Sequence, residues 1–154
     1  MTVPEIVPIA HEPEYRTGTI GRYAGGQFFA SVTYAEGPLR RLYVVLHRFD
    51  ADGRHIDSDI SRADRPPTPS PGAEETPGAA PARAEARLAG LLDGLDGREF
   101  GDIAIRPFRV VFDGVVFGLV TERHAPTPGE EHDWAELYPD RLGFSAPWNG
   151  LYDT

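Results

Sequence analysis

Residues 41–60 read RLYVVLHRFDADGRHIDSDI, and this stretch decides the fold. Two runs with many β-branched and aromatic side chains flank Asp52-Gly53, a dipeptide that favours the tight turn of a β-hairpin. A turn there pairs apolar side chains on one face and mostly opposite charges on the other. The predicted pairs are Val45 with Ile60, Phe49 with Ile56, Arg48 with Asp57 and Asp50 with His55. The stretch therefore predicts an antiparallel hairpin with one face toward a core.

The segments on either side of this hairpin show the same pattern. Residues 19–23 and 27–35 flank Gly25-Gly26, and residues 103–112 and 115–124 flank Asp113-Gly114. The predicted pairs in the later hairpin are Phe108 with Leu119, Val110 with Phe117 and Phe112 with Val115. Pro107 indicates that the first strand of this hairpin lies at a sheet edge or carries a bulge. Three hairpins of this kind predict an antiparallel sheet.

One segment has the spacing of an α-helix. Residues 82–95, ARAEARLAGLLDGL, place apolar side chains on one stripe, and Gly94 and Gly97 are typical of a helix end. The stripe consists of Ala84, Leu88, Leu91, Leu92 and Leu95. Near the C-terminus we expect one short strand around residues 134–138, followed by irregular chain. The order predicts a single α+β domain, residues 1–154, whose antiparallel β-sheet is built from hairpins with one main helix packed on one face.

Residues 62–81 interrupt the apolar pattern. They read RADRPPTPSPGAEETPGAAP, with many prolines and no large apolar side chain. Such a segment buries too little surface to offset its ordering entropy, so we expect a flexible loop. A proline-rich docking motif is the alternative, but a PxxP match such as residues 66–69 arises readily by chance in this composition.

Length and composition bound the function. The chain has 154 residues, a net charge of −9 and no cysteine, which fits one domain and excludes disulfides and cysteine nucleophiles. It also has no lysine, which excludes Schiff-base chemistry and a P-loop lysine. No apolar run reaches the roughly 18 residues of a membrane helix, and no signal-peptide pattern is present. We therefore expect a cytoplasmic protein.

Acidic side chains are concentrated near the C-terminus. Residues 130–154 hold six of them against one basic side chain. They are Glu130, Glu131, Asp133, Glu136, Asp140 and Asp153, against Arg141. Such a surface repels phosphate groups, so we expect neither nucleic acid nor an anionic membrane as a partner. A basic protein partner fits this charge.

The run DADGRHIDSD at residues 50–59 is the densest group of chemically capable side chains. Its spacing fails the EF-hand pattern, so a polar hairpin face explains it with fewer assumptions. Alternation places His55, Asp57 and Asp59 on one strand face, which leaves a weaker acid–base or metal hypothesis open. His47 lies on the other face among apolar neighbours, where a hydrogen-bonded core histidine is commoner than a ligand.

Two further groups are weaker candidates. Arg106 and Glu122 come near one another diagonally in the predicted hairpin, where such a pair marks an anion pocket or a structural ion pair. Residues 130–133, with His124 upstream, lack the HExxH spacing and are typical of a solvated acidic loop. Serine-nucleophile, phosphate-loop and dinucleotide motifs are absent from the sequence. We therefore predict no metal and no cofactor.

Aromatic side chains with polar tips gather near the C-terminus. They are Trp134, Tyr138, Trp148 and Tyr152. Such residues are frequent in binding surfaces, and in a domain of this size they also complete the core. The four are candidate binding residues.

Several stretches carry a resemblance to known proteins. They are residues 9–17 (IAHEPEYRT), 20–23 (IGRY), 46–50 (LHRFD), 84–88 (AEARL), 101–108 (GDIAIRPF), 137–144 (LYPDRLGF) and 150–154 (GLYDT). In these stretches the chain resembles short proteins of high-GC Gram-positive bacteria that are labelled formate hydrogenlyase regulatory protein. The resemblance implies a non-enzymatic, cytoplasmic role and carries over no catalytic or ligand residues.

Three hypotheses follow for the function. The first is a non-enzymatic protein-interaction or regulatory domain that acts through an acidic, aromatic C-terminal surface; an immunity protein facing a basic nuclease is one version. The second is a small enzyme or small-molecule-binding protein whose sheet-lined pocket holds His47 or His55, carboxylates and an arginine. The third is a homodimer formed by edge-strand pairing.

Overall fold

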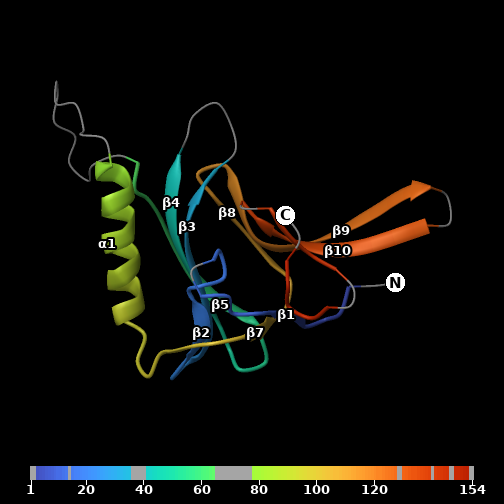
Figure 1. Cartoon of the computed structure of the whole chain (residues 1–154), viewed down its shortest axis with the longest axis horizontal. Coiled ribbons are helices and arrows are strands. Elements are labelled where there is room, and N and C mark those ends of the chain that lie inside the picture. The colour runs from blue at the N-terminus through green and yellow to red at the C-terminus, as the bar shows by residue number, and fades with distance from the viewer. Residues whose placement is uncertain are drawn as a thin grey trace.

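The computed structural model describes residues 3–13, 15–35, 41–64, 78–127, 130–139, 141–145 and 148–152, with the backbone alone for residues 123–127 and 130–133. Within these ranges the fold is α+β, with antiparallel sheets and a single helix, as the hairpin pattern predicts (Figure 1). The elements are β1 (Val7–Ile9), β2 (Ile20–Tyr23), β3 (Gly26–Tyr34), β4 (Leu42–Phe49), β5 (His55–Arg62), α1 (Ala79–Asp93), β6 (Glu99–Phe100), β7 (Ile103–Ile105), β8 (Phe108–Phe112), β9 (Val115–Thr127), β10 (Glu130–Tyr138) and β11 (Leu142–Phe144).

The strands form three sheets, of which the five-stranded one is central. The central sheet has the order β5-β4-β3-β2-β6, a second sheet has the order β11-β10-β9-β8, and β1 pairs with β7. Figure 1 shows α1 on one side of β3 and β4 and the second sheet on the other side. Because adjacent strand residues point to opposite faces, β4 serves both layers, and nearly all of its side chains are buried.

The helix covers one face of the central sheet, as predicted. Ala84, Leu88 and Leu92 are its buried residues and pack against Phe28 and Val44 of the sheet. The helix begins three residues before the predicted start, so Pro81 falls in its first turn, where a missing N–H removes no helical hydrogen bond. The predicted flexible loop, residues 62–81, is thus too wide at both ends. Arg62 belongs to β5, residues 79–81 belong to α1, and residues 65–77 lie outside the described residues.

The hairpin of β4 and β5 confirms the predicted register over most of its length. Val45 pairs with Ile60 and Arg48 with Asp57. The register then shifts by one residue, so that Phe49 faces His55 and Ile56 has no partner of its own. The predicted pairs of Phe49 with Ile56 and of Asp50 with His55 are therefore wrong. The extra residue Ile56 offsets the alternation of side chains, so His55, which precedes it in β5, lies on the face opposite to the one predicted.

The later hairpin confirms its predicted pairs, and Pro107 explains where its first strand begins. Phe108 pairs with Leu119 and Val110 with Phe117, and β8 is the edge of the second sheet. The predicted strand over residues 103–112 is in fact two strands, β7 and β8, in different sheets. The predicted short C-terminal strand is the longer β10, which pairs with β9, and β11 follows it. No helix within the described ranges has the length and apolar content to cross a bilayer.

Candidate functional site

Three side chains between the two larger sheets form a hydrogen-bonded group that we call the histidine cluster: His47, Ser58 and His55. His47 of β4 is buried, and Ser58 lies directly opposite it on β5. The Ser58 Oγ lies 2.6 Å from the His47 Nδ1 and 2.7 Å from the His55 Nε2. The bulge at Ile56 brings His55 to this face. One hydroxyl therefore joins two imidazole rings.

Aromatic rings enclose the histidine cluster. The His55 ring stacks on Phe108 of β8, with 4.6 Å between ring centroids and 14° between planes. The His47 ring meets the same Phe108 edge-on at 4.8 Å. Phe49 also contacts both imidazoles. The cluster is consequently part of the packing between the sheets.

Burial sets the protonation state of both histidines. Burial first, and the nearby His55 second, lower the pKa of His47 to about 3. Burial also lowers the pKa of His55, against the opposing effect of a hydrogen bond to the Asp57 backbone. Both rings are neutral at neutral pH, so each has one N–H and one acceptor nitrogen. The Ser58 hydroxyl can then accept from one ring and donate to the other.

Asp57 and Asp59 do not share a face with His55, and this part of the sequence prediction is wrong. Both carboxylates are exposed and lie on the face opposite the histidine cluster. The Asp57 Oδ1 accepts a hydrogen bond of 2.8 Å from the Arg48 Nη1, as the predicted register requires. No group of three potential metal-ligating side chains occurs in the described part of the chain.

Arg106 and Glu122 lie apart, so the predicted diagonal pair is also wrong. Pro107 ends the strand before it reaches Arg106, whose guanidinium instead contacts the Asp52 carbonyl at 3.2 Å and Glu5 at 3.7 Å. Glu122 accepts a hydrogen bond of 2.7 Å from the Tyr138 hydroxyl. Hydrogen bonds to Glu122 and Glu136 raise the pKa of Tyr138 above its ordinary value.

The other aromatic candidates contribute in part to the core. Trp148 and Tyr152 are partly buried against the cluster of apolar side chains between the sheets, and the Tyr152 ring meets Phe144 edge-on. Trp134 is half-buried on β10. The side chains of Glu130, Glu131 and Asp133 lie outside the described residues. The predicted acidic, aromatic C-terminal surface therefore stays a prediction.

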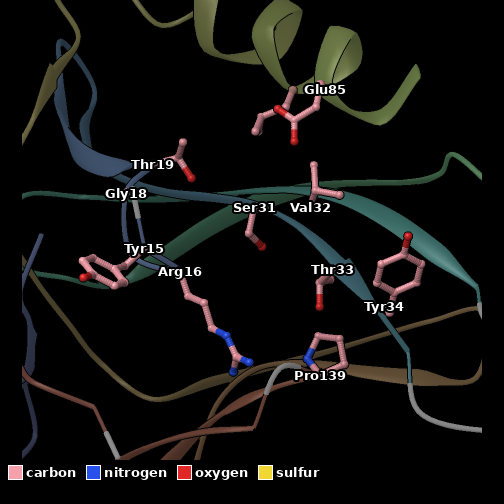
Figure 2. Close-up of a pocket in the computed structure, with 11 residues that line it drawn as sticks. Tyr15, Arg16, Gly18, Thr19, Ser31, Val32, Thr33, Tyr34, Glu85 and Pro139 are labelled. Atoms are coloured by element: carbon pink, nitrogen blue, oxygen red, sulfur yellow. The ribbon is translucent and has the colours of Figure 1, made fainter. Parts of the chain in front are cut away.

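A groove of about 740 Å³ lies elsewhere, along the free edge of β3, and we call it the β3 groove (Figure 2). Its lining comes from one loop, one strand, the helix and the end of β10. The lining residues are Tyr15, Arg16, Gly18, Thr19, Ser31, Val32, Thr33, Tyr34, Glu85, Leu88 and Pro139. A smaller cavity of about 230 Å³ lies near Arg41, Tyr138 and Arg141. Neither cavity is lined by the histidine cluster.

The β3 groove exists because β2 is shorter than β3. Pairing between these strands ends at Ile20 with Phe29, and the Ala30 N–H donates to the Thr19 carbonyl at 2.9 Å. From Ser31 onward no described strand lies beside β3 on the side opposite β4. Backbone groups alternate in direction along a strand, so the N–H and C=O of Val32 point the same way as those of Ala30, into the groove.

The walls and ends of the β3 groove differ in chemistry. Figure 2 shows Glu85 projecting from α1 on one side of the strand and Arg16 on the other side. Tyr15 and Tyr34 stand at the two ends and are 71% and 47% exposed. Exposed tyrosines are enriched at protein interfaces. The groove thus combines a free strand edge, two aromatic ends and two walls of opposite charge.

The sequence contains a signal for the strand but not for the groove. SVTY at residues 31–34 alternates like any strand, and nothing in these residues indicates that pairing with β2 ends at Phe29. Comparisons with protein families, with curated proteins and with solved structures found no match.

Proposed function

We propose that this chain is a protein-interaction domain that binds an extended segment of another protein as an added strand on β3. The observation that carries this proposal is the β3 groove, where a free strand edge lies at the floor of a cavity flanked by α1. Strand addition gives affinity through backbone hydrogen bonds and specificity through alternate side chains. The proposal keeps the interaction role predicted from the sequence, but places it at the β3 groove in place of the acidic, aromatic C-terminal surface.

Two other open sheet edges, β5 and β8, carry features that discourage strand addition. The edge strand β5 has a bulge at Ile56 and two exposed carboxylates, Asp57 and Asp59. The edge strand β8 begins directly after Pro107 and carries the exposed Arg109. Bulges, charges and prolines are the usual protection of edges against pairing. The described edge of β3 at residues 31–33 has none of these, which favours it over β5 and β8 as the docking edge.

A second candidate function is hydrolysis at the histidine cluster. One observation favours it: a serine hydroxyl within 2.7 Å of a neutral imidazole is the arrangement of an activated nucleophile. Turnover of an activated ester that Ser58→Ala abolishes would support this function. The lining of both described cavities by other residues makes it the weaker candidate.

The test of the interaction function blocks the edge without breaking the sheet. Val32→Pro removes an N–H that points into the groove and leaves every hydrogen bond to β4 in place, so the fold should persist. Val32→Thr is the matched control because it keeps the N–H and a β-branched side chain. A displayed library of random peptides is selected on the wild-type chain, and the enriched peptides are titrated into all three proteins.

The expected result is binding to the wild type and to Val32→Thr, with amide shifts in NMR spectra at residues 31–34, and loss of binding by Val32→Pro. Circular dichroism of Val32→Pro verifies that the sheet persists. Peptides that bind Val32→Pro as tightly as the wild type, or a selection that enriches none, would contradict the proposal.

A further inference from the structure

From the two walls of the β3 groove, we infer that the bound segment carries a basic side chain toward α1 and an acidic side chain toward the second sheet, at neighbouring positions of one strand. This inference rests on the proposed function and names the chemistry of its partner. Its basis is the pair of charged residues in the lining, Glu85 and Arg16.

Both charges are available to a partner. Glu85 and Arg16 are exposed, and neither has an ion pair or a hydrogen bond in the part of the chain that the structure describes. Other arginines of this face are engaged: on α1, Arg87 donates to the Ser61 hydroxyl at 3.0 Å and to the Arg62 carbonyl at 2.6 Å. An unsatisfied cation and an unsatisfied anion on facing walls are the complement of a zwitterionic ligand.

The geometry of a strand converts the two walls into a sequence rule. Side chains of an added strand point alternately to the two faces of the sheet. Val32 points to the α1 side in Figure 2, and Ser31 and Thr33 point to the Arg16 side. Consecutive residues of the added strand therefore meet opposite walls. A Lys or Arg adjacent to an Asp or Glu satisfies both walls, and two opposite charges at alternate positions satisfy only one.

A second copy of the chain fits this groove less well than such a segment. If two copies joined their β3 edges antiparallel about a two-fold axis perpendicular to the sheet, each face would continue across the junction. Glu85 would then approach Glu85 of the second copy on one face, and Arg16 would approach Arg16 on the other face. The net charge of −9 adds repulsion between copies. A heterologous segment avoids both costs.

The experiment uses two synthetic peptides of about eight residues, the length of an ordinary strand. Both consist of Thr and Val with one Lys and one Asp; in the first the charges are adjacent, and in the second they occupy alternate positions. Calorimetric titration of the whole chain should give about two- to fivefold tighter binding of the adjacent peptide, the range of an exposed ion pair. This preference should shrink in about 0.5 M salt.

Charge reversal of each wall should change the preference in a predictable direction. Glu85→Arg makes both walls basic, so it should favour a peptide with two adjacent Asp. Arg16→Glu makes both walls acidic, so it should favour two adjacent Lys. Asp93→Arg, on the same helix outside the groove, and Arg54→Glu, in the β4–β5 turn, are controls of equal charge change that should keep the wild-type preference.

The outcomes separate the two proposals. Equal binding of both peptides, at residues 31–34 and sensitive to Val32→Pro, would overturn the charge rule and leave strand addition standing. If neither the synthetic peptides nor any selected library peptide binds, strand addition and the charge rule are both overturned. A dimer in light scattering that Val32→Pro dissociates would show a second copy as the occupant and would overturn the inference.

Discussion

At the scale of single residues, the surroundings of His47 fix its ionisation state. Its ring lies between two sheets, and burial lowers its pKa from 6.5 to about 3. The unfolded chain therefore binds a proton at this residue below about pH 6.5, while the folded chain does so only near pH 3. Stability should fall with decreasing pH across this window, by up to about 1.4 kcal/mol per pH unit.

His47→Gln tests this effect because glutamine can still hydrogen-bond to Ser58 and does not titrate. We expect the wild type to lose more stability than the variant when the pH is lowered from about 7.5 to about 4.5. Urea unfolding at both pH values measures the difference. Equal losses in the two proteins would show that His47 becomes protonated in the folded chain.

The ion pair of Arg48 with Asp57 could be predicted from the sequence, whereas the histidine cluster could not. Their pairing follows from the hairpin register and is confirmed at 2.8 Å, but the pair is partly exposed and such pairs contribute about 0–1 kcal/mol. The histidine cluster was not predictable in the same way. It depends on Phe108, which is distant in sequence, and on a bulge at Ile56. The alternation of side chains in the sequence near the turn gives no sign of this bulge.

At the scale of elements, two turns share the Asp-Gly dipeptide and differ in their surroundings. Gly53 and Gly114 both have positive φ, at 84° and 76°. A Cβ at Gly53 would lie 2.6 Å from the Ala104 carbonyl oxygen of β7, and a Cβ at Gly114 would meet nothing within 4 Å. Gly53 is therefore packed against another strand, whereas Gly114 has open space on its side-chain side and its turn is held through Asp113, whose carboxylate accepts a hydrogen bond of 2.8 Å from the Tyr43 hydroxyl.

Alanine at each turn separates backbone strain from packing. Gly114→Ala should cost about 1 kcal/mol, the penalty of a left-handed conformation, and Gly53→Ala about 2–4 kcal/mol because β7 must also move. Chemical unfolding of the two variants measures the difference. Equal costs would mean that β7 accommodates the added Cβ without loss of stability.

The helix and most strands can be predicted from local sequence. Which strands lie side by side in a sheet cannot. Asp-Gly turns fix registers, and the leucine stripe fixes the face of α1, because both depend on residues close in the chain. The splitting of residues 103–112 at Pro107 and the early end of β2 depend on pairing with distant strands. The β3 groove results from such an ending, so no motif at residues 31–34 could have indicated it.

At the scale of the whole molecule, β4 joins two cores that lie on opposite faces of one sheet. Leu42, Val44 and Leu46 pack toward α1, and Tyr43 and Val45 pack toward the second sheet. A strand whose alternate side chains belong to different cores cannot lose one core without disturbing the other. The layers should therefore unfold as one cooperative unit.

Leu88→Ala tests this coupling from the helix side. Leu88 is 8% exposed and packs in the core between α1 and the sheet, so its truncation should cost about 2–4 kcal/mol. Tryptophan fluorescence reports the other side, because Trp134 lies on β10 and Trp148 packs against the core between the sheets. We expect fluorescence and the NMR amide signals of α1 to shift to the same lower unfolding midpoint. A fluorescence midpoint that stays at its wild-type value while the α1 signals are lost earlier would show that the helix detaches alone, and the α1 wall of the β3 groove would then be a mobile one.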